Sequence, residues 1–328
     1  MMEYRELGNT GLKVSSVSFG TWAIGGSWGS VDEKTALDAL AVAMDAGVNF
    51  FDTADVYGDG RAERLIATAT KGKTKDIHVA SKFCRAADIH DPDTYAEAAV
   101  RKFCEGSLKR LQRETIDLYQ VHCPPLWVIE QGAVFEVLDK LQQEGKIRYY
   151  GVSVETVAEG LTAIQYPGVK ALQVIFNLFR QKPLASLLPK AAAGGVGILA
   201  RLPLASGLLT GKFKATDSFP EDDHRHFNRD GQSFNVGETF AGLPFHKGVE
   251  LAEGLQWIAS DRGNMTRAAL RWIYDQPGVT CAIPGFKNTS QVEDNLLSLQ
   301  VPAYDASERR RLEDYYQSQV EPFIRGGF

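Results

Sequence analysis

Residues 47–58 read GVNFFDTADVYG, a short apolar run that ends at Asp52 and continues into a loop with Tyr57 before a glycine. The valine and two phenylalanines of this run can fill both faces of a sheet, and a strand buried on two sides is almost continuously apolar. Such a strand is typical of α/β proteins, in which ligands bind at the carboxyl ends of parallel strands. Asp52 and Tyr57 therefore lie where a site is expected.

The same alternation of strand and helix recurs along the chain, after residues 4–14, which read as a β-hairpin around a turn rich in Gly and Asn. Besides the strand that ends at Asp52, the expected strands are 17–20, 77–82, 116–122, 149–153, 171–176, 196–200 and 279–283. The expected helices are 32–46, 61–70, 93–112, 129–144, 156–164, 184–193, 248–260, 266–274, 290–297 and 307–317. Eight strand-helix units predict a (β/α)8 TIM barrel with an N-terminal β-hairpin and two additional helices, as one domain over residues 1–328.

The structural rival is a doubly wound parallel sheet. Such a fold usually carries a G-x-G-x-x-G turn after its first strand, whereas residues 25–29 read GGSWG and do not have that spacing. Residues 212–244 are too long for an ordinary connection and show little apolar periodicity. A loop of that length is usually functional or mobile.

Composition sets the protein class. The chain has 328 residues, 44% of them hydrophobic, and a net charge of −5, which argues against nucleic acid or an anionic membrane as a partner. The four cysteines are scattered without a C-x-x-C pair, as expected for reduced thiols. No long apolar window and no apolar core of a signal peptide are present, so we expect a cytoplasmic protein.

Four polar side chains at or just after three successive strand ends form the candidate catalytic set: Asp52, Tyr57, Lys82 and His122. A phenol with a pKa of about 10 is a poor acid at neutral pH, but a neighbouring ammonium stabilises its phenolate. Lys82 can supply that charge, Asp52 can hold Lys82, and His122 can hydrogen-bond a substrate carbonyl or share in proton delivery. This set can protonate a carbonyl oxygen while a bound cofactor delivers hydride to the carbon.

A metal-dependent barrel hydrolase is an alternative, because His122 and Asp52 could be ligands. No second histidine matches a strand end, since His78 begins its strand and His224 and His226 lie in the long segment. We therefore expect no metal site.

The chain resembles the aldo-keto reductases over nearly its whole length. The motifs that carry the resemblance are LGxxGLxVS from residue 7, FGTW from 19, GVNFFDTAxxYG from 47, the strand end at Lys82, DLYQVH from 117, GKIRYYGVS from 145, GLLTGK from 207 and IPG from 283. The resemblance implies a (β/α)8 barrel that uses NAD(P)H and reduces aldehydes or ketones to alcohols. It implies that Tyr57 is the general acid, that Lys82 and Asp52 tune it, and that His122 orients the substrate.

The resemblance also implies a cofactor site. Ser153 and Gln173 would hold the nicotinamide carboxamide, and residues 204–212 and 285–295 would wrap the pyrophosphate and adenosine. Lys287 falls where the family has a basic residue for the 2′-phosphate, which favours NADPH and leaves NADH possible. The full expected set of cofactor contacts is Gly20, Thr21, Trp22, Asp52, Ser153, Gln173, Arg201, Pro203, Leu204, Gly207, Leu209, Gly211, Lys212, Gly285, Lys287, Gln291, Asp294 and Asn295.

Two departures from the family pattern concern the nicotinamide. Val154 stands where an asparagine is common, and Arg201 where many members have an aromatic residue that stacks on the ring. We hypothesise that Arg201 lies near the nicotinamide and disfavours its oxidised, positively charged form. Alternatively, Arg201 turns toward the pyrophosphate or a nearby carboxylate. The expected substrate pocket comprises Trp22, Tyr57, Tyr119, His122, Cys123 and Trp127, with Cys123 widening it.

Two other functions compete with a carbonyl reductase. One is an NAD(P)-dependent sugar or polyol dehydrogenase that works in the oxidative direction with the same four residues. The other is a cofactor-binding regulatory subunit, because channel β-subunits resemble this family. The sequence does not specify the small-molecule substrate, the physiological direction or the oligomeric state.

Overall fold

The core of the molecule is a parallel sheet of eight strands that closes on itself. The computed structural model describes residues 2–26, 28–73 and 76–328. The strands pair in chain order, β3(Phe19–Gly20), β4(Phe50–Asp52), β5(His78–Phe83), β6(Ile116–His122), β7(Ile147–Val154), β8(Val169–Ile175), β9(Gly197–Arg201) and β10(Val279–Ile283). Parallel bridges from Val17 to Ala282 and from Gly20 to Gly285 join the last strand to the first. The predicted (β/α)8 barrel is therefore confirmed.

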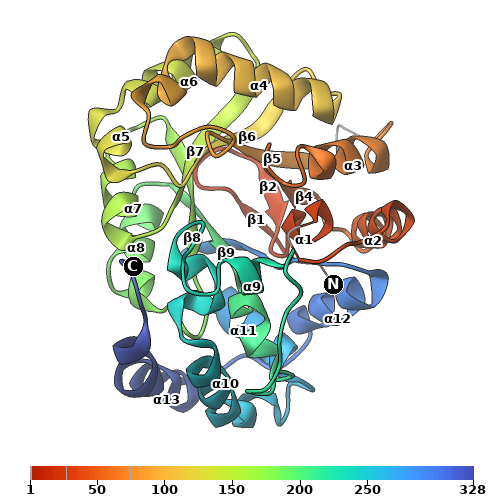
Figure 1. Cartoon of the computed structure of the whole chain (residues 1–328), viewed down its shortest axis with the longest axis vertical. Helices are drawn as coiled ribbons and strands as arrows, with labels where there is room; N and C mark the ends of the chain where they lie inside the picture. Colours follow the sequence, from red (N-terminus) through yellow and green to blue (C-terminus); the bar gives the residue numbers. More distant parts are fainter. Residues whose placement is uncertain (1, 27, 74–75) are drawn as a thin grey trace.

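The helices cover the outside of this barrel (Figure 1). Eight of them follow the strands and pack on it: α2(Glu33–Asp45), α3(Arg61–Ala69), α4(Glu97–Leu111), α6(Ala133–Gln143), α7(Val157–Ala163), α8(Leu187–Ala193), α11(Met265–Tyr274) and α12(Thr289–Leu296). Two further helices, α10(Phe245–Gly254) and α13(Ala306–Tyr315), add to this shell, and three short ones lie in loops, α1(Trp22–Gly25), α5(Leu126–Gln131) and α9(His224–Phe227). Of the helices in the described ranges, none is long and apolar enough to cross a membrane.

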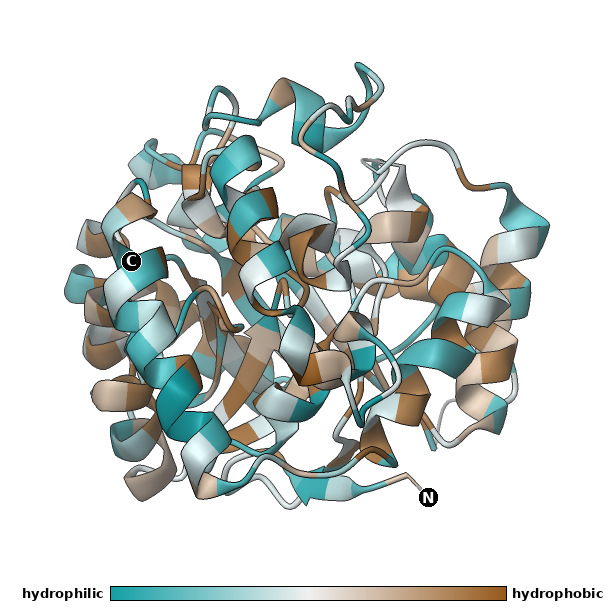
Figure 2. Cartoon of the chain, turned by 90° about the horizontal axis from the view of Figure 1, so that it is seen from below, coloured by the Kyte–Doolittle hydropathy of each residue, from teal (hydrophilic) through white to brown (hydrophobic). Residues whose placement is uncertain are grey.

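The N-terminal hairpin closes the bottom of the barrel. Its strands β1(Tyr4–Glu6) and β2(Lys13–Ser15) are antiparallel, as the sequence predicts. Leu7, Leu12 and Val14 point inward and share a buried cluster with residues from the barrel strands, including Phe50 and Leu118. Figure 2 shows the hydrophobic residues concentrated on the central strands and on the inner faces of the helices. With its base plugged, the barrel leaves only the carboxyl ends of the strands open for a ligand.

Four helices expected as continuous are divided. The expected helix 184–193 begins in a 3-10 turn at Lys182–Ala185 before α8, and the expected helix 248–260 ends in one at Gln256–Ala259 after α10. The expected helix 93–112 consists of a 3-10 turn at Pro92–Tyr95 followed by α4, because Ala96 has an extended backbone with ψ of 148°. The expected helix 129–144 is broken between α5 and α6 at Gly132, whose φ of 72° is left-handed. Glycine adopts that backbone without steric penalty, so it ends one helix and begins the next.

The long segment 212–244 is folded against the barrel although it lacks regular periodicity. It contains α9 and the 3-10 turns Val236–Glu238 and Phe240–Gly242. Its phenylalanine rings pack on one another and on α10, with Phe213 and Phe219 centroids 5.4 Å apart and Phe240 and Phe245 centroids 4.9 Å apart. The segment thus supplies ordered side chains to the open end of the barrel.

Candidate active site

The four expected catalytic residues meet at the carboxyl ends of β4, β5 and β6. Lys82 Nζ lies 2.6 Å from Asp52 Oδ1 and 3.3 Å from the Tyr57 hydroxyl, and it donates to the Thr53 carbonyl at 2.8 Å. The Tyr57 and His122 rings lie edge to face with centroids 6.0 Å apart. Because neighbouring parallel strands end at the same rim, residues from positions 52 to 122 of the chain become one group.

Burial and charge set the protonation states of this group. Burial raises the pKa of Tyr57 above its ordinary value, and the opposing effect of Lys82 does not cancel it. Burial lowers the pKa of Lys82, but attraction to Asp52 outweighs this and the pKa rises. Burial, with help from Arg85 and Lys82, holds the pKa of His122 well below its ordinary value. At neutral pH the group therefore has a phenol, an ammonium ion and a neutral imidazole.

Gln173 holds the other oxygen of Asp52. Its Nε2 donates to Asp52 Oδ2 at 2.7 Å, so the carboxylate is fixed between Gln173 and Lys82. Ser153, the second residue expected at a carboxamide, is fully buried with its hydroxyl 3.3 Å from Cys123 Sγ. Gln173 lines the cavity described below, whereas Ser153 lies beneath its surface.

Arg201 belongs to a group that we call the ionic cluster, made of Arg85, Glu155, Arg201 and Glu238. Arg201 Nη2 lies 3.1 Å from Glu155 Oε2, and its Nη1 lies 3.8 Å from Glu238 Oε1. Arg85 Nη2 lies 2.6 Å from Glu238 Oε1 and 3.2 Å from Glu155 Oε1. Of the orientations considered for Arg201, the structure has the one toward nearby carboxylates.

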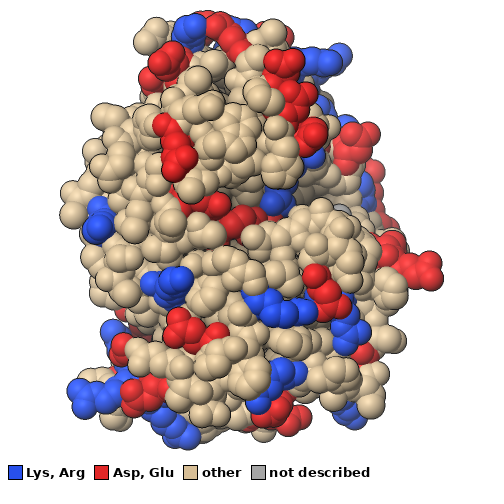
Figure 3. Space-filling view, turned by 60° about the vertical axis from the view of Figure 1, so that its left-hand side comes forward, with Lys and Arg blue, Asp and Glu red and all other residues tan. Residues whose placement is uncertain are grey.

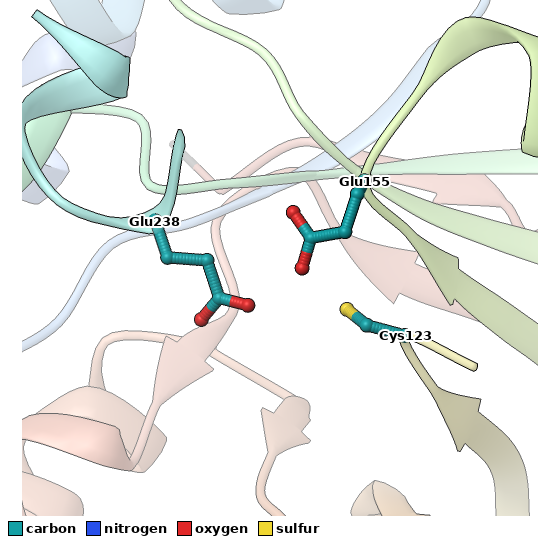
Figure 4. Close-up of side chains that lie close together, drawn as sticks. All are labelled: Cys123, Glu155 and Glu238. Atoms are coloured by element: carbon teal, nitrogen blue, oxygen red, sulfur yellow. The ribbon is translucent and has the colours of Figure 1, made fainter. Parts of the chain in front are cut away.

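The two carboxyl groups of the ionic cluster face each other beside Cys123. Figure 4 shows Cys123, Glu155 and Glu238 converging from three different parts of the chain, and their potential ligand atoms lie within 4.8 Å of one another. Burial raises the pKa of Glu155 to about 7, whereas Arg85 and Arg201 overcome the burial of Glu238 and hold its pKa low. Both carboxyl groups already have guanidinium partners, so this set of donors is poorly suited to a cation.

A cavity of about 1350 Å³ opens above these groups. Figure 3 shows acidic and basic side chains gathered along a hollow in the middle of one face. Most of the expected cofactor contacts line the cavity: Gly20, Trp22, Asp52, Gln173, Arg201, Pro203, Leu204, Gly207, Lys212, Gly285, Lys287, Gln291, Asp294 and Asn295. Four do not, namely Thr21, Ser153, Leu209 and Gly211. Thr21 instead donates its hydroxyl to the Asp52 carbonyl at 2.9 Å, and Leu209 is part of the core.

Two residues expected in the substrate pocket lie elsewhere. Tyr119 is fully buried and stacks on Phe83 with centroids 4.8 Å apart, because alternation along β6 turns it outward to the helices while His122 faces the cavity. Trp127 packs edge to face on Tyr95 at 5.8 Å and is not among the lining residues. Neither residue therefore lines the cavity in this structure. The other expected pocket residues, Trp22, Tyr57, His122 and Cys123, line the cavity.

Several lining residues were missed by the sequence analysis: Trp28, Arg85, Glu155, Arg225, Phe234 and Glu238. Glu155 directly follows strand β7 and Arg85 is the second residue after strand β5, so the strand-end rule that selected Asp52 would also have found them. Glu238 has no such signal, because it lies in the long segment.

The end of the cavity formed by residues 202–213 and 285–295 has features that suit a phosphate-bearing ligand. Four residues here have a left-handed backbone, Leu202, Ala205, Ser206 and Gly207. They fold the chain into a tight turn at the rim of the barrel. Four cationic side chains line the cavity, those of Lys212, Arg225, Arg267 and Lys287, and two of them are already paired with carboxylates, Arg225 with Asp223 and Arg267 with Asp294, each at 2.6 Å. Lys287 donates to the Trp28 carbonyl, and burial lowers its pKa. Clustered cations of this kind bind phosphate well.

Comparison with known proteins places the chain among its relatives. The model of the Aldo/keto reductase family matches residues 16–317. An aldo-keto reductase from Bacillus subtilis, YhdN, is 36% identical over 89% of this chain and 87% of its own. A probable voltage-gated potassium channel subunit beta from Oryza sativa is 30% identical over 92% of each chain. The solved glycerol dehydrogenase AKR11B4 from Gluconobacter oxydans is 30% identical, with a TM-score of 0.77 over 99% of this chain and 98% of its own. The chain therefore belongs to the aldo/keto reductase family, whose members are NAD(P)H-dependent oxidoreductases acting on carbonyl and alcohol groups.

Proposed function

We propose that the protein is an NADPH-dependent reductase of aldehydes and ketones in which Tyr57 donates the proton. The observation that carries the proposal is the contact of the Tyr57 hydroxyl with Lys82, 3.3 Å away, while Lys82 is itself held by Asp52 at 2.6 Å. An ammonium ion at this position stabilises the negative charge that develops on the phenol oxygen as its proton leaves. The four residues Asp52, Tyr57, Lys82 and His122, here called the tetrad, therefore include an acid and a group that stabilises its conjugate base.

The neighbouring residues complete the reaction. Tyr57 is protonated in the resting protein because burial raises its pKa, so it can act as an acid at neutral pH. The neutral imidazole of His122 can donate a hydrogen bond to the substrate carbonyl and hold its oxygen near the phenol. The cofactor, when bound, supplies the hydride that reduces the carbonyl carbon. The carbonyl oxygen takes the Tyr57 proton and the product is an alcohol.

The phosphate-binding end of the cavity supports NADPH as the cofactor. We assign Lys287 to the 2′-phosphate, with Gln291 and Asn295 toward the adenine, and residues 204–212 to the pyrophosphate. The cationic character of this end is the supporting observation. NADH remains a possible second cofactor because the same residues suit its pyrophosphate.

The similarity to a glycerol dehydrogenase favours one second candidate, a polyol or sugar dehydrogenase that runs in the oxidative direction. The similarity to channel β-subunits favours another, a cofactor-binding regulatory subunit. The ratio of the reductive to the oxidative rate at neutral pH separates the first from a reductase, and the absence of turnover with any carbonyl compound would support the second.

A Tyr57→Phe variant tests the proposal directly. It is assayed with NADPH and a panel of small aldehydes, ketones and sugars. We expect kcat to fall by about 10² to 10⁴, the usual contribution of a general acid, while NADPH still binds. Tyr4→Phe, which removes the hydroxyl of an exposed phenol far from the site, is the control and retains full activity. Unchanged turnover in Tyr57→Phe would exclude Tyr57 as the acid.

A further inference from the structure

The ionic cluster is not required by the chemistry proposed above. Hydride and proton transfer involve Asp52, Tyr57, Lys82 and His122, and Lys82 contacts Asp52 and Tyr57 without any member of the cluster. Nor does the cluster contribute much to the free energy of folding. Its four side chains are only 5 to 17% exposed, and removing such charges from water offsets most of their mutual attraction. An apolar lining of similar volume would stabilise the barrel equally well.

The position of the ionic cluster points to the substrate. All four members line the same cavity as His122 and Tyr57. Arg201 Nη2 lies 3.4 Å from Cys123 Sγ, and Cys123 directly follows His122 at the end of β6. Arg85 is close enough to depress the pKa of His122. A substrate whose carbonyl rests on His122 therefore places its neighbouring carbon atoms beside the ionic cluster.

The charges of the ionic cluster narrow the class of ligand. Two guanidinium groups face two carboxyl groups, of which Glu238 stays ionised while burial raises the pKa of Glu155 to about 7, so the cluster has little net charge with which to attract an anion or a cation. It offers alternating donors and acceptors instead. Both hydrogen bonds of Arg85 use Nη2, so within the described part of the chain its Nε and Nη1 donate no hydrogen bond. A hydroxyl group, which donates and accepts at once, matches such a surface.

We infer that the ionic cluster is a hydroxyl-binding subsite that selects carbonyl substrates bearing hydroxyl groups next to the carbonyl. Arg85 and Arg201 donate to the hydroxyl oxygens, and Glu155 and Glu238 accept the hydroxyl protons. An apolar substrate would cover the Arg85 Nε and Nη1 donors without giving them an acceptor, and sites built to bind a hydroxyl group reject analogues that lack it. The inference rests on the proposed function, because it names the substrate class of the same site.

The first test compares D-glyceraldehyde with propanal, which have the same three-carbon chain and differ only in hydroxyl groups. The readout is the ratio of the two kcat/KM values with NADPH, each corrected for the unhydrated aldehyde. We expect the wild type to favour glyceraldehyde by about tenfold or more. The ratio falls toward one in Glu155→Gln and in Glu238→Gln. Glu130→Gln, the same change at an exposed residue of α5, retains the wild-type ratio.

Other results would overturn the inference. A wild-type ratio of the two kcat/KM values near one, or a ratio that neither variant changes, would show that the ionic cluster does not bind the hydroxyl groups of the substrate. A tenfold preference for succinic semialdehyde over both aldehydes would show that it binds anions. If the glutamine variants do not fold, as judged by circular dichroism, Arg85→Lys replaces them. It keeps the charge but removes the planar fork, and the ratio falls in this variant as well.

A binding experiment distinguishes failure of the inference from failure of the proposed function. If no aldehyde is reduced, or if Tyr57→Phe is fully active, the proposed function is wrong. Calorimetry with the NADP⁺-loaded protein then compares erythritol with butane-1,4-diol, which lacks the two internal hydroxyl groups. Erythritol binding at least about tenfold tighter in the wild type, and lost in Glu155→Gln, supports the subsite. Equal affinity for the two compounds would overturn it.

Discussion

Asp55 is a buried carboxyl group next to the proposed active site, and it has no hydrogen-bond partner for either oxygen among the described residues. Burial, and secondarily the nearby Glu63, raises its pKa from 3.8 to about 7. Such a group favours folding only while it is protonated. The folded state keeps its proton between pH 4 and 7 while the unfolded chain loses it, so stability decreases as the pH rises through that range.

An Asp55→Asn variant removes this pH dependence. We expect the variant to gain stability relative to the wild type as the pH rises from 4 to 7, and the difference to level off above 7. Each pH unit between the two pKa values corresponds to about 1.4 kcal/mol, so the full change is on the order of 4 kcal/mol. Urea unfolding at several pH values measures it. A stability difference that stays constant over this range would show that Asp55 ionises normally in the folded protein.

The sequence was most informative for residues whose environment follows from a strand end. Asp52, Lys82 and His122 end or nearly end consecutive strands, so their proximity follows from parallel pairing. The outward direction of Tyr119 could also have been predicted, by counting along β6 from His122. The Gln173 contact with Asp52 could not, because it joins strands on opposite sides of the barrel.

At the scale of elements, the sequence predicts which segments form strands and helices better than it predicts where they end. The eight apolar runs are recognisable because strands buried on both faces have little choice of residue. The break at Gly132 is consistent with a glycine in the first turn of an expected helix, but a glycine alone does not distinguish a break from a tolerated helical position. The fold of residues 212–244 depends on contacts between phenylalanine rings, which no periodicity encodes.

The hairpin that plugs the barrel offers a matched pair of glycines. Gly8 has a φ of 56°, and a β-carbon there would lie 2.4 Å from the Gly195 carbonyl oxygen. Gly11 has a φ of 76° but faces open space. We expect Gly8→Ala to destabilise the protein by at least about 3 kcal/mol, because backbone strain and steric overlap add. Gly11→Ala suffers the strain alone, about 1 kcal/mol.

Thermal or urea unfolding of both hairpin variants gives the comparison. The difference between their free energies of unfolding measures the steric overlap of the hairpin turn with Gly195, just before β9. Equal destabilisation would mean that the turn moves away from Gly195 without loss, and that the hairpin is not a rigid plug.

At the scale of the whole molecule, the cavity exists because three parts of the chain converge over the barrel. The strand ends supply the tetrad, the long segment supplies Glu238 and Arg225, and the loop before α12 supplies Lys287. The first part can be deduced from topology. The other two depend on how loops fold over the rim, which is why Glu238 was missed while Lys287 was found only through resemblance to a family.

Lys287 provides a test of how this assembly selects its cofactor. A ligand that binds only the folded state stabilises it according to its affinity, so the melting temperature reports binding without turnover. We expect NADPH to raise the melting temperature of the wild type more than NADH at equal concentration, because the proposed role of Lys287 is to pair with the additional phosphate. In Lys287→Ala the advantage of NADPH shrinks by about tenfold in affinity, or about 1.4 kcal/mol. Lys190→Ala, at an exposed position of α8, is the control and keeps the wild-type difference. An unchanged difference in Lys287→Ala would move the 2′-phosphate to another cation of the cavity, with Arg225 and Arg267 the next to substitute.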